Sequence, residues 1–265
     1  MARRPAPIDD RDRQLLTLLA QHRVAVIPQL AVAFTDLSRQ ALTARLRRLE
    51  RDGLITTQKI FVGRPTAIAI GKRGLGAIEA ALPAPRIDLK EYRHDIGVGW
   101  LHLAAQQGVF GKLADLRLER ELRSHDRRAD RDGPPLGIGV GNFDASGRQS
   151  RHYPDLLMTT ATGRQVAVEL ELTAKSSHRL TRIMRAYASD SRVSAVLYLV
   201  PDAAGARRIE TAARRAGITR MVQIQRLAED GIYGAPPPLA ASRQARGRRE
   251  SERPHRPRPR EGLTR

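Results

Sequence analysis

The chain has 265 residues, 41% of them hydrophobic, and contains no run of about 18 apolar residues that would predict a membrane-spanning helix. Cysteine is absent, which excludes disulfides, thiolate metal sites and cysteine nucleophiles. Lysine and arginine together number 47 against 28 acidic residues, and the resulting charge of +19 favours a polyanionic partner such as nucleic acid. The length suits two compact domains. Because the first residues hold no apolar segment typical of a secretory signal, we expect a cytoplasmic protein without a membrane partner.

The arginine excess has a second explanation. Only five of the 47 basic residues are lysine, and an arginine- and alanine-rich chain is also typical of a GC-rich genome. Bulk charge therefore cannot decide between a nucleic-acid partner and a compositional bias. The positions of the arginines within the predicted elements have to decide it.

The first part of the chain predicts a winged helix-turn-helix. Leucines at helical spacing indicate three helices, the last of which ends at an Asp-Gly pair, and two apolar runs around a Gly-Arg-Pro turn indicate a hairpin. A fourth helix follows the hairpin. The expected helices are 9–22, 27–34, 35–55 and 71–81, and the expected strands are 54–62 and 66–71.

The middle of the chain is less regular. A proline-punctuated linker is expected at 83–92, and helical spacing continues to residue 107. Residues 110–124 are expected to end in a strand. Residues 127–150 are polar and rich in glycine, which predicts a long loop that includes the sequence GIGVGN at 137–142.

Strand and helix patterns then alternate, which predicts an α/β core with a sheet that is at least partly parallel. The expected strands are 153–160, 164–172, 194–201 and 220–227, and the expected helices are 178–189 and 203–216. Beyond them, residues 235–265 carry nine arginines against three glutamates and almost no apolar residues, so we expect a disordered basic tail. The expected organisation is a disordered start at 1–8, a DNA-binding domain at 9–82, a linker at 83–92, an α/β domain at 93–234 and the tail.

The third predicted helix has the composition of a DNA reader. In a winged helix this element enters the major groove, where arginine pairs with guanine and glutamine with adenine, while the wing contacts a phosphate or the minor groove. We therefore expect double-stranded DNA as the partner. The candidate contacts are Ser38, Arg39, Gln40, Thr43, Arg45 and Arg47 on the helix and Arg64 in the wing. The alternative is a solvated basic face on a domain that binds protein.

Acidic residues gather in the hairpin predicted at 153–172. Side chains alternate along a strand, so Glu169 and Glu171 share a face, and Asp155 opens the neighbouring strand. Three carboxylates of this kind suit Mg²⁺ or Mn²⁺, which activates water in phosphodiester hydrolysis, and Lys175 follows close behind. The alternative is a solvent-exposed pair of glutamates held by arginines such as Arg179 or Arg182.

The order of Asp155, Glu169 and a following lysine resembles the PD-(D/E)xK nuclease superfamily, whose acids bind metal and whose lysine positions the attacking water. The resemblance implies a restriction-endonuclease-like α/β fold and assigns catalytic roles to Asp155, Glu169, Glu171 and Lys175. Glu171 stands where the family usually has lysine, which leaves cleavage open. Glu119 or Glu121 would supply the further upstream acid that some members have.

Taken whole, the two domains and the motif ELELTAKS with Arg182, Arg185 and Tyr187 on the next helix resemble the replication-relaxation protein family of bacterial plasmids and integrative elements. The resemblance implies a DNA-binding protein of a mobile element, with replication or mobilisation proteins as further partners. Two alternatives stay open: an active Mg²⁺-dependent endonuclease that nicks or cleaves DNA, and a transcriptional regulator.

Overall fold

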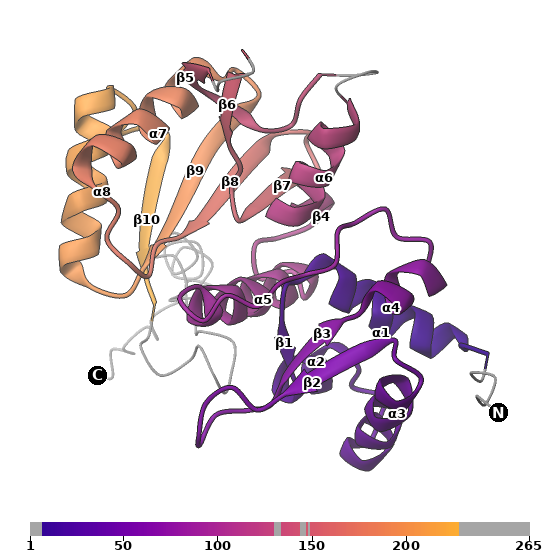
Figure 1. Ribbon diagram of the computed structural model, residues 1–265. Helices are drawn as coiled ribbons and strands as arrows, with labels where there is room; N and C mark the ends of the chain where they lie inside the picture. The colour runs from indigo at the N-terminus through magenta and orange to yellow at the C-terminus, as the bar shows by residue number, and fades with distance from the viewer. Residues whose placement is uncertain (1–6, 130–133, 144–146, 148, 228–265) are drawn as a thin grey trace, which may run out of the picture.

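The computed structural model describes residues 7–129, 134–143, 147 and 149–227 (Figure 1). It is an α/β protein. An N-terminal unit of helices with a small antiparallel sheet precedes a mixed five-stranded sheet with its own helices. Most of the segment expected to be disordered at the start, and the whole of the basic tail at 235–265, lie outside the described residues. Ile8, just inside them, packs against the first core.

The N-terminal unit contains the helices and hairpin that the sequence predicts. One short strand between the first two helices was not expected, and it pairs with the second hairpin strand, so that the sheet order is β1-β3-β2. The elements are α1 (Asp10–Gln21), β1 (Ala25–Val26), α2 (Ile27–Ala33), α3 (Arg39–Arg51), β2 (Ile55–Gln58), β3 (Ala67–Ile70) and α4 (Lys72–Ala77).

Local sequence explains where these helices begin and end. The side chain of Asp9 accepts a hydrogen bond from the Asp12 N–H at 2.7 Å, and the Asp12 side chain accepts one from the Asp9 N–H. The two bonds form a capping box at the start of α1. Ser38 caps α3 in the same position. Gly74 lets α4 approach the hairpin, since a Cβ there would lie 2.2 Å from the carbonyl oxygen of Leu54.

The second unit is built on a five-stranded sheet of order β10-β9-β8-β7-β4. Strands β4, β7 and β8 are antiparallel neighbours, whereas β8, β9 and β10 run parallel and are joined by helices, which confirms the expected partly parallel sheet. The elements are α5 (Tyr92–Gln106), β4 (Leu113–Leu118), α6 (Glu119–Ala129), β5 (Ile138–Phe143), β6 (Gln149–His152), β7 (Leu156–Thr160), β8 (Gln165–Leu170), α7 (Ser177–Ser189), β9 (Val193–Val200), α8 (Ala203–Ala216) and β10 (Val222–Arg226).

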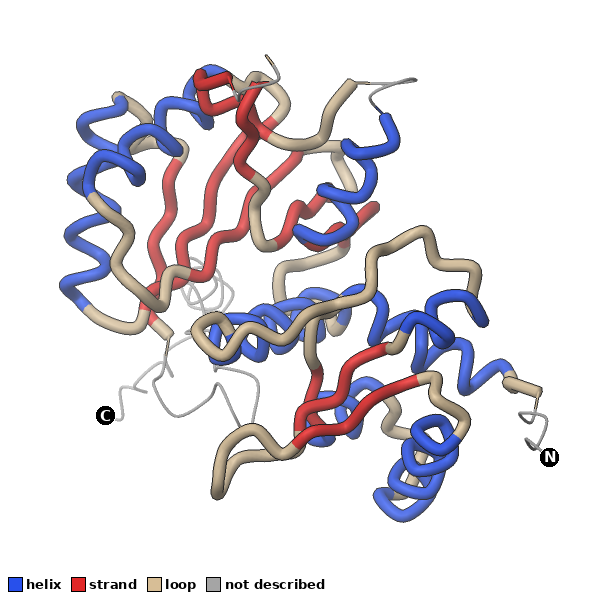
Figure 2. Tube along the Cα trace, in the orientation of Figure 1, coloured by secondary structure: helices blue, strands red, loops and turns tan. Residues whose placement is uncertain are grey.

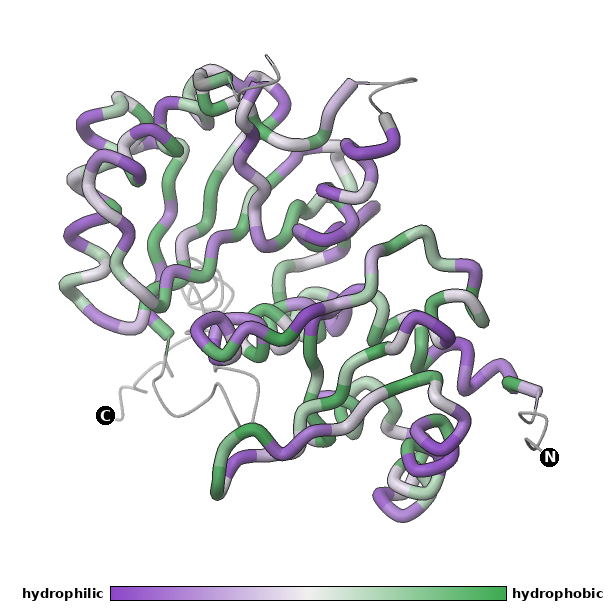
Figure 3. Tube along the Cα trace, in the orientation of Figure 1, coloured by the Kyte–Doolittle hydropathy of each residue, from purple (hydrophilic) through white to green (hydrophobic). Residues whose placement is uncertain are grey.

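Helices cover both faces of this sheet (Figure 2). Ala167 and Tyr198 pack against α7 and α8 on one face, whereas Val168 and Leu199 pack against α5 on the other. The central strand β9 is correspondingly apolar along most of its length, whereas the edge strand β10 and the outer helices alternate between apolar and polar residues (Figure 3). Buried strands of this kind read as apolar runs, as expected for parallel pairs covered on both faces.

Helix α5 belongs to both units. Ile96 and Trp100 are fully buried in the core of the N-terminal unit, and Leu101 is fully buried against the five-stranded sheet. In Figure 1 the helix lies between the two sheets. A helix buried on all sides needs no polar face, which is why its sequence shows no clear apolar stripe. Among the described residues, no helix is long and apolar enough to cross a membrane.

Two expectations for the middle of the chain are wrong. Residues 110–124 begin with strand β4 and continue into helix α6, whereas a terminal strand was expected. The glycine-rich stretch at 138–143, expected to be a loop, forms β5 and pairs with β6. Gly139 is needed there because the Gln149 side chain lies only 2.7 Å from where a Cβ would stand.

Candidate functional site

A cavity of about 700 Å³ lies where the two units meet. Its walls come from Arg23 between α1 and β1, from the segment before α5 and α5 itself, from the start of α6, from the residues before β7 and from the end of β8 with the loop that follows. Asp155, Glu169, Glu171 and Lys175 all line it, so the structure brings the four residues that the sequence singled out in the hairpin to one place. The surrounding wall is also highly charged, with six carboxylates and five lysines or arginines in total.

Asp155 lies directly before β7, where the hairpin places it beside the end of β8. One carboxylate oxygen accepts a hydrogen bond from the Leu170 N–H at 2.7 Å, and the same oxygen lies 3.2 Å from Nε2 of His94 on α5. Burial lowers the pKa of His94, but the carboxylate of Asp155 outweighs it and raises the pKa to about 9. Asp155 and His94 therefore form an ion pair at neutral pH.

Glu169 is the most deeply engaged of the acids. Its side chain is buried on the α7 side of β8, and one oxygen both lies 2.6 Å from Nε2 of His152 and accepts a hydrogen bond from the hydroxyl of Tyr187. Burial raises the pKa of Glu169, but the combined effect of His152, Lys175 and Tyr187 is larger and opposite. The pKa of Glu169 therefore falls below its ordinary value. Burial and the Glu169 charge raise the pKa of Tyr187 well above its usual range.

Glu171 and Lys175 form a pair just beyond the end of β8. The ammonium of Lys175 donates to one oxygen of Glu171, and the Lys175 N–H donates to the other at 3.1 Å. Burial lowers the pKa of Lys175, but Glu169 and Glu171 together raise it. Lys175 thus remains charged inside the cavity and faces both glutamates.

The expectation that the three acids converge on one cation is not met by this arrangement. Carboxylate oxygens are suitable ligands for Mg²⁺, but Asp155, Glu169 and Glu171 are each engaged by a separate cationic or hydroxyl partner. Across the described part of the chain, no group of three or more His, Asp or Glu side chains is positioned to hold a metal ion. The residues present do not fit a divalent cation as they stand.

The alternative of an exposed glutamate pair is wrong. Glu169 and Glu171 are 3% and 4% exposed, and their partners are His152, Tyr187 and Lys175; within the described residues no hydrogen bond or ion pair joins them to Arg179 or Arg182. A buried carboxylate without such partners would be costly. The acids of the hairpin are therefore part of an internal polar network at the cavity wall.

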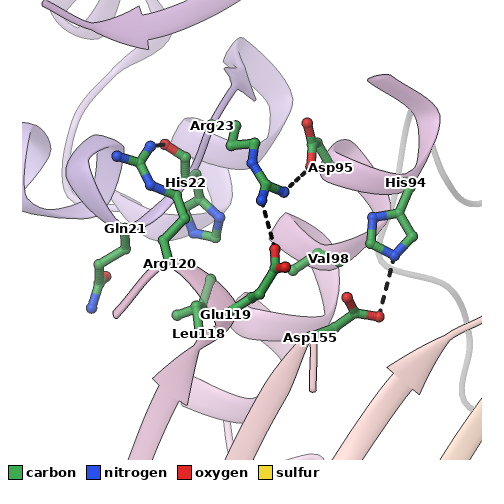
Figure 4. A pocket seen from close by; sticks show the side chains of 10 residues that line it. All are labelled: Gln21, His22, Arg23, His94, Asp95, Val98, Leu118, Glu119, Arg120 and Asp155. Atoms are coloured by element: carbon green, nitrogen blue, oxygen red, sulfur yellow. Dashed lines mark hydrogen bonds and ion pairs between the residues drawn. The ribbon is translucent and has the colours of Figure 1, made fainter. Parts of the chain in front are cut away.

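Of the two upstream acids, only Glu119 reaches this region. The guanidinium of Arg23 forms ion pairs with the carboxylate of Glu119 at 2.7 Å and with that of Asp95 at 3.1 Å (Figure 4). These three side chains and Asp155 line a small cavity of about 20 Å³. Burial raises the pKa of Glu119, but Arg23 and Arg123 bring it below its ordinary value. Glu121 instead caps its own helix by accepting from the Leu118 N–H.

The predicted DNA contacts divide into two groups. Arg39, Gln40 and Arg47 are exposed on α3, and Arg64 is exposed in the β2–β3 loop. The others have roles within the fold: Ser38 caps α3, the Thr43 hydroxyl donates to the Arg39 carbonyl at 2.8 Å, and Arg45 is held by acids of α1.

Sequence reasoning missed part of the network. The motifs and spacings of the sequence assign no site role to His94, His152 or Arg23. His152 stands three residues before Asp155, which is a signal that the sequence offers. The pairing of His94 with Asp155 spans 61 residues and that of Arg23 with Glu119 spans 96, so no local pattern marks either.

Comparison with known proteins finds no matching family model and no curated protein that resembles the chain closely enough to count as a match.

Proposed function

We propose that the chain binds double-stranded DNA through a winged helix formed by its N-terminal unit. The observation that carries the proposal is the order α1-β1-α2-α3-β2-β3 with sheet order β1-β3-β2, which is the arrangement of winged-helix domains. In this arrangement α3 is the element that enters the major groove. Helix α3 and the β2–β3 loop both lie at the end of the molecule away from the five-stranded sheet (Figure 1).

The side chains on that end suit DNA. Arg39, Gln40 and Arg47 project from α3, and the loop presents Lys59 and Arg64. The loop is also supported from behind, since the ring of Phe61 packs edge-on against Tyr92 of α5 with 5.4 Å between ring centres. Arg45 and Arg48 take no part in this surface, because Asp12 holds both against α1.

Equilibrium binding of the full chain to a short duplex tests the proposal. Each phosphate contact contributes about 0.9 to the slope of log affinity against log salt, so Arg47→Ala/Arg64→Ala, which removes one exposed arginine from α3 and one from the β2–β3 loop, should reduce the slope by roughly 1.8. The matched control is Lys112→Ala/Arg117→Ala, which removes the same charge from the edge of the five-stranded sheet. Equal slopes for the two double variants would reject the assignment of α3.

For the second unit we propose a nuclease-like domain without turnover. The succession α5-β4-β7-β8-α7-β9, with α6, β5 and β6 inserted after β4, matches the core expected of the PD-(D/E)xK superfamily. The paired state of its acids argues against metal-assisted cleavage. We further propose that the protein acts in the replication or mobilisation of a plasmid or integrative element, as the resemblance in its motifs implies.

The second candidate function is a Mg²⁺-dependent endonuclease, and it is favoured by the presence of Asp155, Glu169 and Lys175 around one cavity. Plasmid nicking with Mg²⁺, Mn²⁺ or EDTA decides between the two. We expect no metal-dependent nicking. Nicking that requires metal and disappears in both Asp155→Asn and Glu169→Gln would establish the endonuclease instead, and Glu171→Lys would then be expected to increase it.

A further inference from the structure

A second basic surface lies on the outer helices of the α/β unit. A groove of about 380 Å³ runs between the start of α7 and the length of α8, and its lining includes Lys175, Arg207, Arg208, Thr211 and Arg215. Arg215 donates to the hydroxyl of Ser177 at 3.0 Å, which holds the end of α8 against the beginning of α7. Apart from Lys175, which precedes α7, the lining residues belong to the packed helices α7 and α8.

The charge of this layer is almost entirely of one sign. Helices α7 and α8 carry seven arginines and a single glutamate, Glu210. Among the described residues, no carboxylate forms an ion pair with Arg207, Arg208 or Arg215. A compositional bias toward arginine would leave acids interspersed, as they are on α1 and α6. Clustered cations without counter-charges are typical of surfaces that contact phosphates.

The groove also continues toward the cavity described above, because Lys175 lines both. The first helical turn of α7 adds the positive end of a helix dipole beside it. Three kinds of positive charge therefore follow one another along this surface: arginine side chains, a helix N-terminus and the half-buried Lys175.

We infer that the groove between α7 and α8 binds the phosphate backbone of a second DNA segment, so that one molecule holds two. Helices α7 and α8 lie at the opposite end of the molecule from α3 (Figure 1). A short duplex centred on α3 leaves the groove open. The choice of DNA as the polyanion rests on the proposed function. The inference that the groove binds phosphates rests on its shape and on the arginines that line it.

A bridging experiment tests the inference with the full chain. One short duplex is immobilised, protein is added, and the capture of a second, fluorescent duplex is measured over a range of salt. In Arg207→Ala/Arg208→Ala, capture of the second duplex should fall and its salt slope should drop by roughly 1.8, while Lys112→Ala/Arg117→Ala should lose far less. Equal loss in the two variants would overturn the inference.

Because the chain contains no cysteine, a single introduced cysteine can be labelled selectively, and crosslinking from it shows whether DNA lies against that surface. Thr211→Cys places a unique thiol in the groove, and Ala44→Cys places one on the exposed side of α3; both are labelled with a benzophenone and irradiated with duplex DNA. We expect adducts from both. No adduct from position 211 overturns the second DNA site, whereas no adduct from position 44 overturns the proposed function, so the two failures are distinguishable.

Discussion

At the scale of single residues, a buried histidine pair ties the two units together. His22 ends α1 and His102 lies on α5, with Nε2 of the first 2.9 Å from Nδ1 of the second. Arg120 of α6 donates to the His22 carbonyl at 2.6 Å (Figure 4). Burial lowers the pKa of both rings, to about 4 for His102 and well below the ordinary value for His22, where His102 and Arg120 add to the effect. Both histidines are therefore neutral in the folded protein.

This pair predicts sensitivity to mild acid. In the unfolded chain His102 takes up a proton near pH 6.5 but in the folded protein only near pH 4, so the stability it contributes is present above pH 6.5 and is lost as the pH falls toward 4. The loss should reach about 3 kcal/mol. Urea unfolding at several pH values measures it. The decline should be smaller in His102→Gln and unchanged in the control His178→Gln, which alters an exposed histidine; identical curves for all three proteins would contradict the prediction.

His94 predicts the opposite dependence. Its pKa of about 9 exceeds the unfolded value of 6.5, so its contribution to stability is complete below pH 6.5 and is lost as the pH rises to 9. Asp155→Asn removes the carboxylate that raises the pKa of His94 most, so this pKa should fall clearly below 9, although Asp95 and Glu91 continue to raise it against the effect of burial. The pKa of His94 is measured by NMR, from the chemical shifts of the histidine ring protons recorded over a range of pH in the presence of EDTA. A His94 pKa that stays near 9 in the variant would show that Asp155 is not its partner.

At the scale of elements, α1 and α3 are fastened by one buried carboxylate. Asp12 is 0% exposed and receives both Arg45 and Arg48, whose side chains remain partly exposed. Asp12→Asn leaves Arg48 without a counter-charge and Arg45 with Asp9 alone, and it should lower the free energy of unfolding by about 3 kcal/mol. Asp10→Asn, on the exposed side of the same helix, should change it little. A similar small effect from both substitutions would show that the pairing contributes no stability.

The shared helix α5 predicts how the chain can be divided. Tyr92, Ile96 and Trp100 complete the core of the N-terminal unit, so a fragment ending at residue 82 should lack a closed core. A fragment ending at residue 107 retains these side chains. Thermal unfolding followed by circular dichroism should show a cooperative transition for the longer fragment and none for the shorter. A cooperative transition in the shorter fragment would mean that α5 is dispensable for this core.

The elements that the sequence predicts best carry their own signals. Helices α1, α3, α7 and α8 each have a side-chain cap and one apolar face, which are local features. Strand β5 has neither, and it forms because β6 pairs with it and because Gln149 covers Gly139. Helix α6 begins where the Glu119 N–H donates to the Asp155 carbonyl at 3.1 Å, a contact with a distant segment.

The same distinction applies to the site. The alternation of side chains along a strand is enough to predict that the acids of this hairpin lie close together. The structure confirms that Asp155 lies beside the end of β8, where Glu169 and Glu171 are located. Their partners cannot be placed in this way, because His94 and Tyr187 come from helices on opposite faces of the sheet. Whether such acids hold a metal or pair internally depends on these partners.

At the scale of the whole molecule, the cavity lies between the N-terminal unit and the basic groove of α7 and α8. Arg23 and His94 line it from the N-terminal unit and from the shared helix, and Lys175 lines both the cavity and the groove. The polar network of the cavity therefore stands between the two surfaces that we propose to bind DNA.

We propose that the N-terminal turn of α3 reads bases in the major groove while the β2–β3 loop holds the backbone. Selection of preferred duplexes from a random pool, carried out for the full chain, for Arg39→Ala and for Arg64→Ala, tests it most directly. We expect Arg39→Ala to lose the preference at particular base pairs, since an arginine bidentate to guanine contributes about 1–3 kcal/mol of discrimination, and Arg64→Ala to weaken all sequences evenly. Unaltered base preferences in Arg39→Ala would contradict the account.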